Sequence, residues 1–212
     1  MAAFAFAART DRLIAALPND SYLRRVGRAK QLLEEVLPLS RLALSLKLPG
    51  LRVLVTAHEN DGPVDGRIEV SGFITRDFDV EVTYASYGQE EALRSELLSR
   101  SGFAPAAGPI SRAKSGEIVA TMGAIDCDEH INRLCSATMA RFKSKSEKAY
   151  ATKPVLLIAF DEVKLFGVAN WSGLFAAIAK AGGMRSSSFQ EVHLFNGATN
   201  ETHRVWSDAC AS

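Results

Sequence analysis

The sequence has little of several features that would assign it to a specialised class of protein. It holds only three cysteines, an odd number, so we expect no disulfide framework. The same count favours a reducing, cytoplasmic setting. Its formal net charge is +1, so no global field attracts a polyanion, and any nucleic-acid binding must come from a local patch. No apolar run approaches the roughly 20 residues of a membrane span, so we expect no membrane partner.

Signatures of common enzyme classes are also missing from the sequence. It contains no Gly-x-Ser-x-Gly elbow for a hydrolase nucleophile, no Walker-type phosphate loop and no dinucleotide fingerprint. Cys127, His130 and Cys135 lie close together, but their spacing within one helix does not put all three on one face, and a fourth ligand is missing. A zinc site is therefore not expected.

The remaining composition is that of an ordinary globular protein, with 47% hydrophobic and 23% charged residues among 212. We expect an N-terminal arm over residues 1–20, either flexible or a short helix, and a single α/β domain over residues 21–212. Pro38 should kink or divide the first helix of that domain. The elements follow the order helix, three strands, helix, hairpin, helix, strand, helix, strand, which predicts a mixed central β-sheet flanked by helices.

The most informative stretch is residues 78–85, where apolar and polar side chains alternate strictly, as in a β-strand with one polar face. Asp79, Glu81 and Thr83 share that polar face. A preceding strand begins near Asp65, and a short turn joins the two strands as a hairpin. Hairpin pairing would bring the Asp65 and Glu81 carboxylates together, and paired hard oxygen ligands hold Mg²⁺ in phosphoryl-transfer sites.

The long helix expected over residues 128–150 carries a lysine on its apolar stripe. At about 100° per residue, Lys145 projects with the apolar side chains of that helix. Such a lysine either snorkels near the helix end or reaches across to the acidic strand and supplies a cation there. Arg141, Lys143 and Lys148 would form an outer basic patch for phosphate contacts, unless they are simply solvated.

These residues suggest a family. The sequence resembles the restriction-endonuclease-like PD-(D/E)XK nuclease superfamily in a series of features. These are Asp65 at the start of a strand, a turn, a second strand with Glu81 and Thr83 two residues apart, and then a helix. That fold begins helix, three-stranded meander, helix, strand, and the order is similar over residues 32–122. The resemblance implies that Asp65 and Glu81 bind Mg²⁺ or Mn²⁺ and that the substrate is a phosphodiester of DNA or RNA. Thr83 falls on the position of the motif lysine, for which Lys145 is the candidate substitute.

Other interpretations of the same residues stay open. Thr83 in place of a lysine is consistent with a nuclease fold that has lost catalysis and acts as a binding or regulatory module. A third interpretation is an α/β interaction protein whose acidic hairpin is only a solvated face. Asp79, Glu34 and Glu35 are spare carboxylates that would add a metal ligand, and the sequence does not decide whether a homodimer forms.

Overall fold

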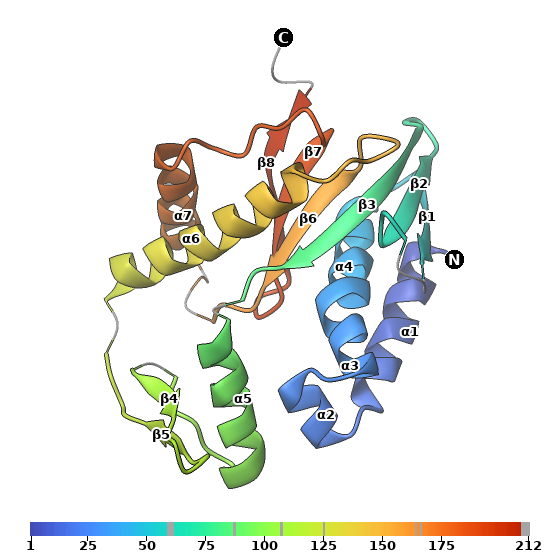
Figure 1. Ribbon diagram of the computed structural model, residues 1–212. Coiled ribbons are helices and arrows are strands. Elements are labelled where there is room, and N and C mark those ends of the chain that lie inside the picture. Colours follow the sequence, from blue (N-terminus) through green and yellow to red (C-terminus); the bar gives the residue numbers. More distant parts are fainter. Residues whose placement is uncertain are drawn as a thin grey trace.

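The computed structural model describes residues 1–58, 62–86, 88–106, 108–124, 126–163, 165 and 167–208. Six strands form one mixed central sheet in the order β1-β2-β3-β6-β7-β8 (Figure 1). The strands β1 to β3 form an antiparallel meander, β3, β6 and β7 run parallel, and β8 returns antiparallel to β7. The strands are β1 (Arg52–Ala57), β2 (Gly66–Ser71), β3 (Arg76–Tyr84), β4 (Ile110–Arg112), β5 (Ile118–Ala120), β6 (Val155–Phe160), β7 (Glu191–Asn196) and β8 (Glu201–Ser207). The mixed sheet that the order of elements predicts is confirmed.

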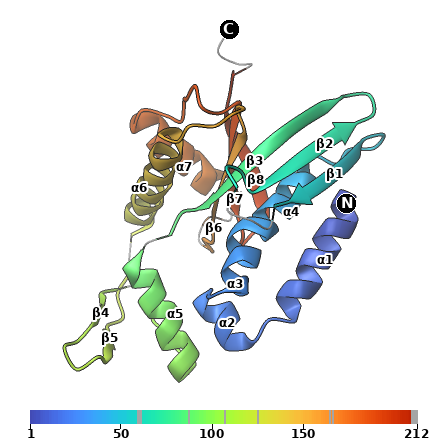
Figure 2. The same ribbon diagram turned by 45° about the vertical axis from the view of Figure 1, so that its right-hand side comes forward.

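Helices cover both faces of this sheet, with α1 and α4 on one face and α6 and α7 on the other. The helical elements are α1 (Ala3–Ala15), α2 (Asn19–Arg24), α3 (Arg28–Gln31), the π-helix η1 (Leu32–Val36), α4 (Leu37–Ser45), α5 (Gln89–Ser101), α6 (Cys127–Ser146) and α7 (Val168–Lys180). Helix α5 and the β4–β5 hairpin extend away from the sheet (Figure 2). Within the described ranges, every helix is too short or too polar to cross a membrane.

Strand β6 separates two hydrophobic cores, and all six of its residues are buried. Val155 and Leu157 point into the core beneath α1 and α4, whereas Leu156 and Ile158 point into the core beneath α6 and α7. A strand covered on both faces needs a continuous apolar sequence, which is what β6 has.

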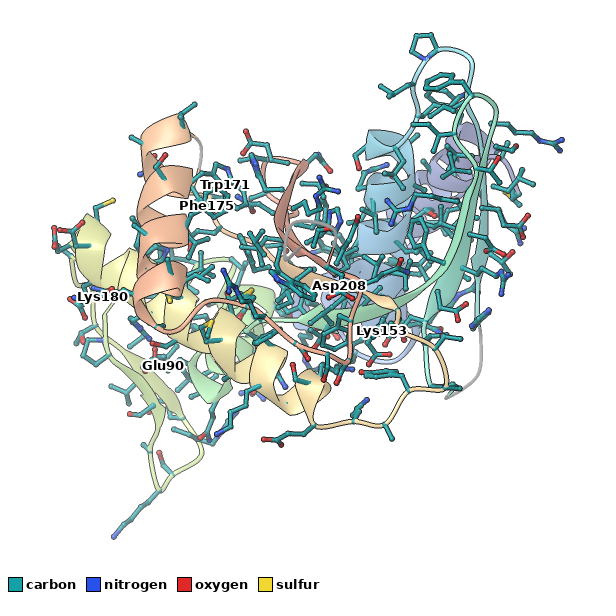
Figure 3. All side chains as sticks on the ribbon, turned by 90° about the horizontal axis from the view of Figure 1, so that it is seen from above. Glu90, Lys153, Trp171, Phe175, Lys180 and Asp208 are labelled. Atoms are coloured by element: carbon teal, nitrogen blue, oxygen red, sulfur yellow. The ribbon has the colours of Figure 1, made fainter. Side chains whose placement is uncertain are left out.

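Aromatic side chains fix α7 on the second core. Trp171 and Phe175 lie side by side on α7 (Figure 3), with ring centroids 5.6 Å apart. The Trp171 indole N–H donates to Glu201 on β8 at 2.9 Å. Because α6 packs against both α7 and β6, these contacts also hold α6 over the centre of the sheet.

The first 20 residues contribute to the other core. Ala3, Phe6 and Ala7 of α1 are buried, and the Met1 ammonium donates to the Val55 carbonyl oxygen of β1 at 2.8 Å. This segment therefore packs on the sheet as a helix and continues the layer formed by α4.

The break in the first helical region lies earlier than Pro38. Arg25 and Gly27 have left-handed φ angles of 50° and 56°, and they separate α2 from α3. Pro38 sits in the first turn of α4 and has no N–H to donate to the preceding turn, which is the π-helix η1. The kink expected at Pro38 thus takes the form of a widened turn inside a continuous helical segment.

Close approach of the backbones at Gly66, the first residue of β2, predicts a stability effect. A Cβ atom there would lie 2.5 Å from Leu39 Cδ2 and 2.8 Å from the Thr56 carbonyl oxygen. The Leu39 side chain can move, but the Thr56 oxygen belongs to the β1–β2 ladder. We expect Gly66→Ala to lower the free energy of unfolding by about 2 kcal/mol in urea denaturation. Ser71→Ala at the exposed end of β2 should change it by less than about 0.5 kcal/mol, and similar values for both variants would contradict the close approach.

Candidate functional site

Strand β3 extends beyond the first residue of β2, and this leaves a notch at the edge of the β2–β3 ladder. Gly66 is opposite Val80, and the Asp65 amide donates to the Val80 carbonyl oxygen at 2.9 Å. Asp65 is therefore across from Glu81, and residues opposite each other in an antiparallel ladder share a face. The Val82 amide, which lies past the start of β2, donates to Asp65 Oδ2 at 2.6 Å. The Asp65 carboxylate thus accepts a backbone hydrogen bond from β3 at a position that β2 does not reach.

Glu81 is a buried carboxylate, 3% exposed, on the face of the sheet covered by α6. Its Oε1 atom contacts the Lys145 ammonium and lies 3.4 Å from Lys148 Nζ. Tyr150 follows the end of α6, and its ring packs 5.5 Å from that of Phe189. Burial, and then the Glu81 carboxylate, raise the pKa of the Tyr150 phenol, so the hydroxyl stays protonated next to Glu81. Asp65, Glu81, Lys145, Lys148 and Tyr150 are called the notch site below.

One further carboxylate, that of Glu35, approaches the notch from η1, on the opposite face of the sheet. Burial, and then the carboxylates of Asp65 and Glu34, raise the pKa of Glu35, against the opposing effect of Lys30 and Lys145. Glu35 therefore lies near enough to Asp65 to feel its charge. An element on this face can reach Asp65 because the notch leaves that edge of β3 uncovered by β2.

The pKa of Asp65 is also raised, and the cause is mainly burial, to which the Glu81 charge adds. The hydrogen bond from Val82 and the charges of Lys145 and Lys148 act in the opposite direction. At Asp65, burial and the Glu81 charge thus outweigh the stabilisation of the carboxylate by Val82 and the two lysines.

The other predicted site residues are placed as follows. Thr83 is 8% exposed on the same strand as Glu81 and carries no charge, so the ammonium at Glu81 comes from α6, as proposed from the helical stripe. Arg141 and Lys143 are exposed on α6. Lys148, expected in an outer basic patch, instead turns toward Glu81.

Asp79 does not join the notch site. Its Oδ2 accepts a hydrogen bond from the Thr152 hydroxyl at 2.9 Å, and its Oδ1 lies 3.7 Å from Arg67. In the part of the chain that the structure describes, no three His, Cys, Asp or Glu side chains lie close enough together to hold a metal ion by themselves. Any ion here would take two carboxylates and complete its shell with water.

The residues considered for zinc are dispersed. His130 contacts Glu162, Cys135 is buried in the core beneath α6, and Cys127 is exposed. Cys210 lies outside the described residues.

Sequence reasoning missed two members of the notch site, Tyr150 and the inward direction of Lys148. Both follow Ser146, the last residue of α6, so the 3.6-residue period that places Lys145 no longer applies to them. A tyrosine after a helix gives no signal that its hydroxyl will meet a carboxylate 69 residues earlier in the chain.

The raised pKa of Asp65 predicts a pH-dependent cost in stability. A carboxyl group whose pKa is raised by folding favours the folded state below its unfolded pKa, near 4, and that benefit is lost as pH rises through the folded pKa. With EDTA present, we therefore expect Asp65→Asn to be more stable than the wild type at pH 7 by on the order of 1 kcal/mol, with the gap closing toward pH 4. Urea denaturation across this pH range measures the gap.

The matched variant Asp65→Ala should be less stable than Asp65→Asn at every pH. Asparagine can still accept the hydrogen bond from Val82, whereas alanine leaves that amide without its partner. A stability gain in Asp65→Asn that does not change with pH would contradict this account.

No protein-family model, curated protein or solved structure matches this chain. What the notch site does must therefore be inferred from its own side chains.

Proposed function

We propose that the chain is a divalent-metal-dependent nuclease with a restriction-endonuclease-like fold and that the notch site is its active site. The observation that carries the proposal is the meeting of Asp65, Glu81 and Lys145, which come from the start of β2, from β3 and from α6. Two acids across one β-ladder, with an ammonium against one of them, form the set of groups that the resemblance to PD-(D/E)XK nucleases requires. The order α4, β1–β3 meander, α5 supports the same fold assignment.

The donor atoms in the notch site suit Mg²⁺ or Mn²⁺. Asp65 uses Oδ2 for the Val82 amide and Glu81 uses Oε1 for its lysines, which leaves one oxygen of each carboxylate for an ion. Glu35 would contribute through water. Mg²⁺ prefers hard oxygen ligands and keeps several waters, so two carboxylates suffice for it. When bound, such an ion would lower the pKa of a coordinated water and stabilise charge on the phosphate.

Lys145 supplies the fixed positive charge that Thr83 lacks. Its side chain is only 19% exposed and is held against Glu81, so its ammonium has a defined position beside the carboxylates. A preorganised cation in a largely desolvated site stabilises the charge that builds up on a phosphate under attack more effectively than a solvated one. We assign Lys145 this role.

A second function, nucleic-acid binding or regulation without cleavage, is favoured by one specific observation. The Lys145 and Lys148 ammoniums both pair with the same oxygen of Glu81, and Thr83 provides no further charge. A carboxylate so fully paired is a poorer metal ligand, as expected if catalysis has been lost.

Cleavage assays separate these two functions. We expect the wild type to nick supercoiled DNA or cut single-stranded RNA in Mg²⁺ or Mn²⁺, and Asp65→Asn, Glu81→Gln and Lys145→Met each to lower the rate about 100-fold or more. Lys153→Met is the matched control, because Lys153 forms a surface ion pair with Asp208 at 3.0 Å. Figure 3 labels both residues. This control should keep the wild-type rate.

Melting temperature in the same metals gives the complementary result. A rise that Asp65→Asn abolishes, in a protein that cleaves neither DNA nor RNA, would select the binding module over the nuclease. Cleavage that Asp65→Asn leaves intact would refute the assignment of the notch site.

A further inference from the structure

The two ammonium groups at Glu81 are held very differently. Lys145 lies within α6, its side chain is 19% exposed, and it contacts Oε1 closely. Lys148 lies beyond Ser146, the end of α6, with a side chain that is 54% exposed and an Nζ atom 3.4 Å from the same oxygen. Of the two, Lys148 is therefore the one that can leave Glu81 without disturbing the packing of α6.

We infer that Lys148 is a resident counter-ion of the notch site, that a divalent ion displaces it from Glu81, and that the released ammonium then binds a phosphate of the nucleic-acid backbone. This inference rests on the proposed function and deepens it. It assigns to Lys148 a positioning role that depends on whether the metal is bound.

Electrostatics require such an exchange. A divalent ion between Asp65 and Glu81 would stand within several ångströms of both ammoniums, and like charges at this range repel strongly when they are partly desolvated. Lys148 is the more exposed of the two lysines and lies farther from Oε1, so it is the one that yields. Its exposed, flexible stem lets the ammonium move away.

The side of α6 that carries these lysines offers a place for a phosphate. Arg141 and Lys145 lie four residues apart on α6, and Lys148, just past the end of that helix, approaches the same Glu81 oxygen as Lys145. Arg141 is exposed on α6 and acts electrostatically on Glu34, the neighbour of Glu35 in η1. A released Lys148 would add its ammonium to the positive charge of Arg141, and such pairs bind backbone phosphates.

Two neighbours of Glu81 stay in place during the exchange. The Tyr150 ring is fixed against Phe189, and Lys145 lies within α6 against Oε1. The carboxylate thus retains both of them while its exposed ammonium departs.

Metal titration tests the first half of the exchange. Mg²⁺ or Mn²⁺ binding is followed by calorimetry and by melting temperature in the wild type, in Lys148→Met and in the control Lys153→Met. Removing the competing ammonium should lower the concentration for half-saturation about tenfold in Lys148→Met. The control, which loses the same charge from the surface ion pair with Asp208, should match the wild type.

Oligonucleotide binding tests the second half. Fluorescence anisotropy is measured in EDTA and in Ca²⁺, which prefers the same hard oxygen ligands. In EDTA, Lys148 is held by Glu81, so Lys148→Met and the wild type should bind alike. In Ca²⁺ the wild type should gain about three- to tenfold more affinity than Lys148→Met, with a steeper salt dependence, because one more phosphate contact forms.

An unchanged metal midpoint in Lys148→Met would overturn the inference, as would an equal loss of oligonucleotide affinity with and without Ca²⁺. A metal midpoint that disappears in Asp65→Asn but is the same in Lys148→Met and the wild type rejects only the counter-ion role of Lys148. If the wild type shows no metal midpoint, or if Asp65→Asn has the same midpoint as the wild type, the proposed metal site is rejected. The role of Lys148 is then rejected with it.

Discussion

Burial of the Glu81 carboxylate is the constraint on which the rest of the site depends. An ionised carboxylate that is 3% exposed costs several kcal/mol unless a partner compensates for its lost hydration. Lys145 provides that partner only if α6 packs on β6, the strand next to β3, so that its last turn lies within reach of Glu81. The position of α6 depends in turn on α7, which Trp171 ties to Glu201 at the far edge of the sheet. The electrostatics of the site are thus coupled to the packing of the whole second core.

The site also requires that β3 extend past Gly66, the first residue of β2. If β2 began one residue pair earlier, its backbone could pair with Val82, and Asp65 would lose the hydrogen bond that orients it. The same shortening uncovers the edge of β3, so that η1 brings Glu35 toward Asp65 from the opposite face of the sheet. One local feature of strand pairing therefore creates a place where side chains from both helical layers meet.

Sequence periodicity predicts part of this arrangement and fails for identifiable reasons. A period of two places Glu81 on the polar face of its strand and pairs it with Asp65, and a period of 3.6 directs Lys145 toward that strand. The π-helix that carries Glu35 has no comparable signal, because its wider turn depends on tertiary packing as well as on the proline that follows. Tyr150 lies past the end of α6, where only the path of the chain determines its direction.

The charge balance of the notch site explains why two lysines are present rather than one. Asp65 and Glu81 formally carry two negative charges, and Lys145 with Lys148 carries two positive ones, so the notch site is formally neutral. Adding a divalent ion without any other change would leave two excess positive charges in a largely desolvated space. Departure of Lys148 halves that excess, and Glu35, which lies near Asp65, opposes the rest. A buried site that never moves far from neutrality avoids the desolvation cost of an uncompensated charge in either state, and an exposed lysine just beyond a helix end is a simple way to achieve this.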